Sequence, residues 1–150
     1  MYANKKNKIL LLFLIPLSLI LFDQLSKFLT TRWGGFSVCN KGIAWGIAIP
    51  EKIFWLFWTA VIVVLAVLLI KISQKTSVLS RQENGLKFRF QERLAIAAIL
   101  AGAFSNFIDR MARGCIVDFI DLRIWPVFNF ADICIVLGGL LLLARILKLW

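Results

Sequence analysis

The feature that most constrains the fold is an uninterrupted run of 18 uncharged residues, Ile53 to Ile70, between Lys52 and Lys71. An apolar helix of about 20 residues crosses the ~30 Å hydrocarbon core of a bilayer. The rest of the chain agrees, because 61% of its 150 residues are hydrophobic, more than a soluble core of this size could hide. We therefore expect an integral membrane protein with a single domain, residues 1–150.

Three more apolar segments complete the expected membrane domain. The first follows Lys8, and because no small-residue cleavage site comes after it, we interpret it as an uncleaved membrane span. Between the first and second spans lies a glycine-rich stretch, 31–50, that lacks helical periodicity and is expected to be extended or turn structure. The predicted fold is all-α, with four transmembrane helices (9–31, 53–70, 94–112 and 130–147) and a small extracytoplasmic β-like segment.

Basic residues set the expected orientation. Eleven of the 18 Lys and Arg lie at the two termini or in the polar connection 71–93. By the positive-inside rule, both termini and this connection are cytoplasmic. The net charge of +10 does not indicate nucleic-acid binding, because the basic residues lie between apolar runs and not in a patch interleaved with aromatics.

Polar residues gather at one expected height. Half of the eight acidic residues lie within 101–132. At about 1.5 Å of rise per residue, Asp23 lies ~22 Å above Lys8, and Asn106 and Asp132 each lie ~20 Å above the basic residue at the cytoplasmic end of their helix. Polar groups at membrane depth are costly unless they are paired or hydrated, so this convergence near the outer boundary predicts a functional site.

Two aspartates suit acid-base chemistry. Asn129 resembles a helix N-cap with Asp132 at the third helical position, where a helix N-terminus favours the charged carboxylate. The segment around Asp118 looks extended, so Asp118 and Asp121 point to opposite faces and only one can enter the site. A second carboxylate close to a charged one holds a proton, and such a pair can drive attack of water on an amide. Arg110 could then hold a carboxylate or a charge on the substrate.

Other residues in this region favour structural roles. Asp109 and Arg113 share one face of the third span, and Asp23 and Lys27 are four apart on the first. For Lys27, Asp109 and Arg113 we favour ion pairs that tie helices together. The cysteines, Cys39, Cys115 and Cys134, match no metal or redox spacing; the first two could pair in an oxidising compartment, but we favour unpaired packing residues.

Four ordered motifs resemble bacterial lipoprotein signal peptidase, signal peptidase II. They are Asp23-Gln-Leu-Ser-Lys27; Asn40-Lys-Gly42-Ile-Ala-Trp-Gly46; Asn106-Phe-Ile-Asp109-Arg110 leading to Gly114-Cys-Ile-Val-Asp118; and Phe128-Asn129-Phe-Ala131-Asp132. The resemblance implies a four-span aspartic endopeptidase of the bacterial inner membrane. Such an enzyme removes signal peptides from prolipoproteins just before the lipid-modified, diacylglyceryl cysteine, at the outer boundary of the membrane.

The resemblance also implies residue roles. Asp118 and Asp132 match the catalytic pair, and a group of polar residues matches the lining of the site: Asp23, Asn40, Asn106, Arg110 and Asn129. Structural support is expected from Lys27, Gly42, Gly46, Asp109 and Gly114. No metal and no cofactor are expected; the expected partners are the signal peptides of lipid-modified prolipoproteins and membrane lipids, and the expected state is a monomer.

Three alternatives remain from the residues alone. A small transporter or proton-conducting protein would also use intramembrane carboxylates, although nearer the midplane and with repeated or broken helices. A Ser-Lys peptidase could use Ser26 or Ser105 with Lys27. A divalent-metal hydrolase could use Asp118, Asp121 and Asp132, but the absence of His removes all His-containing zinc sites.

Overall fold

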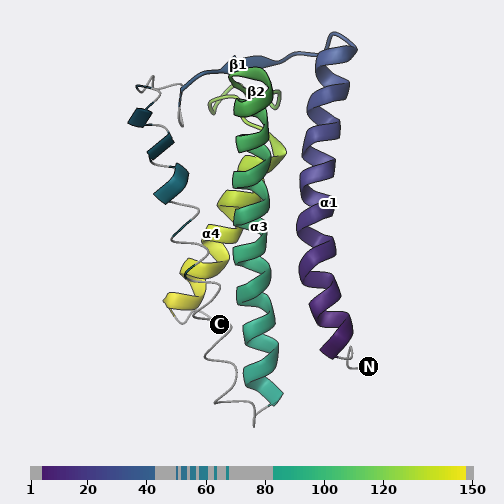
Figure 1. The fold of residues 1–150 in the computed structure, drawn as a ribbon, viewed down its shortest axis with the longest axis vertical. Helices are drawn as coiled ribbons and strands as arrows, with labels where there is room; N and C mark the ends of the chain where they lie inside the picture. The colour runs from purple at the N-terminus through teal and green to yellow at the C-terminus, as the bar shows by residue number, and fades with distance from the viewer. Residues whose placement is uncertain are drawn as a thin grey trace.

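The computed structural model describes residues 5–42, 50, 52–53, 55–56, 58–60, 63, 67 and 83–147. Its elements are helix α1 (Lys5–Arg32), strand β1 (Val38–Asn40), helix α3 (Glu83–Arg113), strand β2 (Ile116–Asp118) and helix α4 (Phe130–Ile146). Helices α1, α3 and α4 pack alongside one another, and the two short strands lie across one end of them (Figure 1). The described part of the chain is thus mostly helical, with a small two-stranded antiparallel sheet.

Three of the four predicted spans coincide with described helices. Helix α1 runs without interruption through Pro16, and α4 begins at the predicted residue and ends within one residue of the predicted end. Within the described residues, two helices, at Leu10–Arg32 and Phe90–Arg113, are long and apolar enough to cross a membrane, while α4 has 17 residues. The second predicted span, 53–70, lies mostly outside the described residues, and those described within it are helical.

Helix α3 corrects one expectation. We interpreted 71–93 as a polar connection, but the helix already begins at Glu83. Lys, Arg, Glu and Gln are strong helix formers, so a basic segment can continue a helix beyond its apolar part. Residues 71–82 lie outside the described part of the chain.

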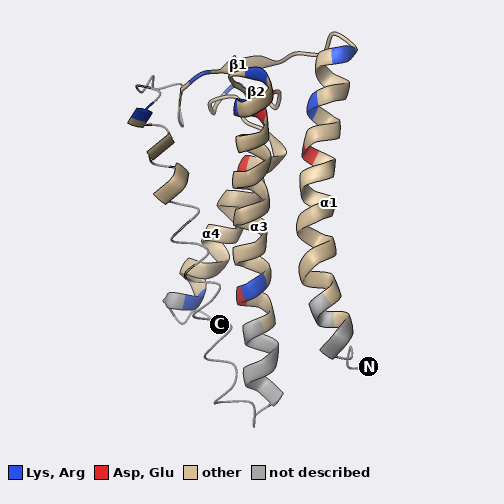
Figure 2. Ribbon diagram, viewed as in Figure 1, with Lys and Arg blue, Asp and Glu red and all other residues tan. Residues whose placement is uncertain are grey.

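Apolar side chains cover the outside of the helices. Phe13 is 73% exposed on α1, and Leu17, Leu21, Val136 and Leu140 are also exposed. The buried positions include many small or polar residues, an arrangement that suits a protein surrounded by lipid. Figure 2 shows charged residues near the strand end and again lower on α3 and α4, with uncharged ribbon between.

A close approach of α3 and α4 depends on glycine. A Cβ built on Gly102 would lie 2.3 Å from the Ala131 carbonyl oxygen, and one on Gly138 would lie 2.7 Å from that of Ala95. The backbones can therefore meet only where the side chain is absent. This contact fixes the start of α4, which carries Asp132, against α3.

Candidate active site

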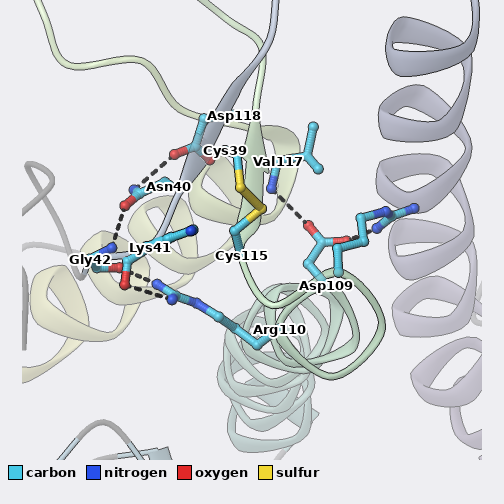
Figure 3. Close-up of a disulfide and its surroundings, with 10 residues drawn as sticks. Cys39, Asn40, Lys41, Gly42, Asp109, Arg110, Cys115, Val117 and Asp118 are labelled. Atoms are coloured by element: carbon cyan, nitrogen blue, oxygen red, sulfur yellow. Dashed lines mark hydrogen bonds and ion pairs between the residues drawn. A yellow bond between two sulfur atoms is a disulfide. The ribbon is translucent and has the colours of Figure 1, made fainter. Parts of the chain in front are cut away.

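Asp118 ends strand β2, whose three residues are all buried. In the antiparallel register Asp118 lies opposite Val38, and Asn40 is two residues further along β1. The Asn40 amide donates to Asp118 Oδ2 at 2.9 Å (Figure 3), and the Asn129 amide donates to Oδ1 at 2.6 Å. Both oxygens of this buried carboxyl group are therefore held by neutral amides.

Asp132 lies in the first turn of α4. Asn129 is the N-cap, its side-chain oxygen accepts from the Asp132 N–H at 3.0 Å, and Asp132 Oδ2 accepts from the Asn129 N–H at 3.2 Å. The predicted capping box is thus confirmed. Asp132 Oδ1 accepts from the Asn106 amide at 2.8 Å. Asn129 therefore contacts both aspartates, Asp118 from the segment before Pro126 and Asp132 from the segment after it.

Burial raises the pKa of Asp118 from 3.8 to about 6. Removal of the carboxyl group from water is the largest cause, and the negative charge of Asp132 adds to it. The amides of Asn40 and Asn129 and the charge of Lys27 act in the opposite direction, because they favour the ionised form. Asp118 can accordingly gain or lose a proton within a unit or so of neutral pH.

A second buried polar group adjoins this pair, and we call it the ion-pair cluster: Asp23, Gln24, Lys27, Ser105, Asp109 and Arg113. Lys27 is fully buried, and its Nζ lies 2.6 Å from Asp23 Oδ2 and 2.7 Å from Asp109 Oδ2. Asp109 also pairs with Arg113 on α3. The expected Asp23–Lys27 and Asp109–Arg113 pairs are present within α1 and α3, and the pair that ties the two helices together is Lys27–Asp109.

The ion-pair cluster holds the backbone on which both aspartates sit. Asp23 Oδ1 accepts from the Ala131 N–H at 2.9 Å, at the start of α4. Asp109 Oδ2 accepts from the Val117 N–H at 3.2 Å, next to Asp118 on β2 (Figure 3). The two carboxylates of the cluster thus fix the residues directly before Asp132 and Asp118.

Arg110 holds the chain that follows β1. Its guanidinium donates to the Lys41 carbonyl at 2.7 Å and to the Gly42 carbonyl (Figure 3). The Gly42 N–H in turn donates to Asn40 Oδ1 at 2.9 Å, which leaves the Asn40 amide N–H group directed at Asp118. Arg110 thus donates hydrogen bonds to backbone carbonyls, and its positive charge also interacts with the expected kind of partner, the carboxyl group of Asp118.

The remaining predicted support residues divide three ways. Gly42 is buried in the contact just described. Gly114 has φ of +71°, a conformation that favours glycine, and it turns the chain from α3 into β2. Gly46 lies outside the described residues.

Asp121 is exposed, and its carboxylate accepts from the Arg123 N–H at 2.7 Å, so the expected separation of Asp121 from Asp118 is confirmed.

The favoured interpretation of the cysteines was wrong for two of them. Cys39 and Cys115 form a disulfide, with 5.5 Å between their Cα atoms, that joins β1 to the residue before β2 (Figure 3). Two cysteines can form a disulfide only where their backbones lie close together. Cys39 and Cys115 are neighbours because β1 pairs with β2, and this register cannot be predicted from the spacing of the cysteines. Cys134 is free.

Sequence reasoning also missed two cluster residues. The Gln24 amide donates to Ser105 Oγ at 2.9 Å and to Asp109 Oδ1 at 3.1 Å, and the Ser105 hydroxyl donates to Asp23 Oδ2 at 2.7 Å. Ser105 was considered only as a nucleophile. Its position next to Asn106 and four before Asp109, on a face with polar partners, was the available signal.

Comparisons with known proteins agree with this arrangement. The family model described as signal peptidase (SPase) II matches residues 15–148. A lipoprotein signal peptidase of Staphylococcus aureus strain RF122 is 31% identical over 90% of this chain and 86% of its own length. One from Syntrophomonas wolfei is 40% identical over 73% of this chain and 65% of its own length. A solved structure described as a bacterial membrane enzyme is 29% identical, with a TM-score of 0.65 over 91% of this chain and 87% of that one.

Proposed function

Because the chain belongs to the signal peptidase II family, we propose that it is an aspartic endopeptidase that removes signal peptides from lipid-modified prolipoproteins, cleaving before the diacylglyceryl-cysteine. The curated relatives are lipoprotein signal peptidases. The observation that carries the catalytic assignment is that Asp118 and Asp132, from β2 and α4, both hydrogen-bond to Asn129. A transporter is not favoured, because it would not require a carboxyl pair held in this way.

The two aspartates divide the chemistry. Asp132, at a helix N-terminus, is the ionised base that takes a proton from water as the water oxygen attacks the scissile carbonyl carbon. Asp118 is the protonated acid, and it gives its proton to the carbonyl oxygen or to the leaving nitrogen. The raised pKa of Asp118 supports this division. The amide bond breaks, and the pair ends with one proton, as it began.

The proposed site residues surround this pair. Asn40 donates to Asp118, Asn106 donates to Asp132, and Asn129 donates to both. Asp23 holds the backbone beside Asp132. Arg110 fixes the two residues that follow Asn40 at the end of β1. Lys27, Gly42, Gly46, Asp109 and Gly114 complete the proposed support.

We further propose a four-span topology in the bacterial inner membrane, as one domain and as a monomer. Both termini are cytoplasmic and the aspartates lie near the outer face. The Cys39–Cys115 disulfide supports this placement, because disulfides persist in oxidising compartments and it lies at the strand end beside Asp118. Membrane lipids and the lipid-modified signal peptides are the proposed partners.

The test is the cleavage of a lipidated precursor by Asp118→Asn and Asp132→Asn variants in detergent or vesicles. Each is expected to lower kcat by about 10³-fold or more, since each removes an acid-base group. Asp118→Asn is expected to stay folded with a loss of about 1–3 kcal/mol in the free energy of unfolding, because its amide nitrogen replaces one of the two oxygens that accept from Asn40 and Asn129. Asp121→Asn is the matched control, an exposed aspartate of the same segment, and is expected to keep full activity.

Near wild-type cleavage by either amide variant would exclude that aspartate from the catalytic pair. Ser26→Ala is expected to remain active, since the Ser26 hydroxyl donates to the Phe22 carbonyl of its own helix at 2.7 Å. Its inactivation would revive the Ser-Lys alternative. Full activity in the presence of a metal chelator is expected, and loss of activity would favour the metal-dependent alternative.

A further inference from the structure

Lys27 uses all of its hydrogen-bond donors inside the protein. Besides Asp23 and Asp109, its Nζ donates to Asn106 Oδ1 at 3.0 Å. An ammonium group has three N–H donors and no acceptor, so these three oxygens satisfy it completely. The side chain is 0% exposed, and no water is needed to complete its shell.

This arrangement fixes the orientation of the Asn106 amide. Lys27 binds the amide oxygen, so the amide N–H group points the other way, to Asp132 Oδ1 at 2.8 Å. A flipped amide would place N–H against the ammonium and oxygen against the carboxylate. Since Asn106 is only 2% exposed, water cannot compensate for those two contacts.

We propose that Lys27 is a positioning residue for the reaction: through Asn106 it keeps a hydrogen-bond donor aimed at the aspartate that accepts the proton of water. This inference rests on the proposed function and goes beyond an ion pair between helices. With Oδ1 held by Asn106 and Oδ2 by the Asn129 N–H, the Asp132 carboxylate is fixed at both ends. Its remaining lone pairs then face a constant direction while it takes up a proton.

A plain Lys27→Met variant cannot test this, because it leaves Asp23 and Asp109 buried with Arg113 as the one remaining cation of the cluster. The double variant Lys27→Met/Asp23→Asn is charge-balanced, since Asp109 keeps Arg113, and residue 23 can still accept from the Ala131 N–H. Its control is Asp23→Asn, which retains the Lys27 contact with Asn106. Because this control carries one excess positive charge in the cluster, kcat is taken per folded enzyme in both variants. Should the double variant not fold, Lys27→Met/Asp109→Asn takes its place, with Asp109→Asn as its control and with kcat again taken per folded enzyme.

Two measurements test the positioning role of Lys27. We expect kcat for a lipidated precursor to be about 100-fold lower in the double variant than in its control, with KM unchanged. In nuclear magnetic resonance spectra, the Asn106 side-chain N–H proton bonded to the carboxylate is expected downfield in the wild type and the control, and to lose that shift in the double variant. The resonance is assigned by its absence in Asn106→Ser.

Equal kcat and an unchanged Asn106 resonance in the double variant and its control would show that Lys27 is purely structural, and would overturn the proposal. If the wild-type protein does not cleave a lipidated precursor, the proposed function fails. The resonance still reports then whether Lys27 orients Asn106, so the two failures are distinguishable.

Discussion

Two sets of buried carboxylates lie next to each other in this protein, and their partners differ. In the ion-pair cluster, Asp23 and Asp109 share the ammonium of Lys27, and Asp109 also meets Arg113. Asp118 and Asp132 instead receive hydrogen bonds from the amide groups of three asparagines. One set is neutralised by cations, and the other is held by uncharged donors.

The difference separates structure from chemistry. Removal of a carboxylate that is bound to a buried cation would leave that cation unpaired, so the group is tied to its partner. Such a pair can hold helices together. A carboxylate held by amides has no such constraint, and burial can bring its pKa towards neutrality, as it does for Asp118. The same residue type thus serves two purposes a few residues apart.

The comparison is tested most strongly by Asp109→Asn. The substitution leaves Lys27 and Arg113 with one carboxylate fewer and an excess buried positive charge. We expect a loss of about 3–5 kcal/mol in the free energy of unfolding, measured by denaturation in detergent micelles. Cleavage should fall in proportion to the folded fraction.

The matched comparison is Asp118→Asn, for which the expected loss is mainly in activity, with a smaller loss of stability than in Asp109→Asn. If Asp109→Asn were stable and inactive, the cluster would have to be counted as part of the reaction site. If it were stable and active, Asp109 would have no essential role.

Much of this division could be predicted from the sequence, because height along a helix follows from residue number. Asp23, Asn106 and Asp132 were expected at one level, and contacts between their helices now join them. Asn106 donates to Asp132, while Asp23 accepts from the N–H of Ala131, the residue before Asp132. The capping box at Asn129 depends on local sequence and was equally predictable. Both predictions rest on geometry within one element.

Contacts that depend on how elements face one another could not be predicted. That Lys27 bridges two aspartates and an asparagine depends on the rotation of α1 against α3. The Cys39–Cys115 disulfide depends on the register of β1 with β2. The Arg110 contacts go to backbone carbonyls, which have no sequence signature at all. These features were missed for one reason. The order of residues along one element does not show which of its side chains will face a particular residue of another element.

A smaller effect is expected from Gly102→Ala, which tests whether the close contact between α3 and α4 positions Asp132. The new Cβ would lie 2.3 Å from the Ala131 carbonyl oxygen and 2.9 Å from Ile135 Cγ1, so α4 must move away from α3. We expect a loss of about 1–3 kcal/mol in the free energy of unfolding, with cleavage reduced beyond the loss of folded protein.

Gly139→Ala on α4 is the matched control, because nothing lies within 4 Å of its Cβ position. It is expected to keep its activity and to gain about 0.5–1 kcal/mol from the better helix propensity of alanine. Equal behaviour of the two variants would show that the close contact at Gly102 does not position Asp132.

The smallest expected effect is a shift in the pH dependence of kcat/KM. It tests Asp118, one of the two aspartates that are held by amides. Asp118 binds its proton more tightly in the folded state than in the unfolded one, so its contribution to stability is full below about pH 4 and is lost as the pH rises through about 6. As the proposed acid it must be protonated, and kcat/KM should therefore fall about tenfold per pH unit above that region. Asn40→Ala removes a donor that favours the ionised form, so the falling limb should move to higher pH. The measurement is the pH at which kcat/KM begins to fall, because altered substrate binding can change the size of kcat/KM. A fall that begins at the same pH or at a lower pH would show that Asp118 is not the acid.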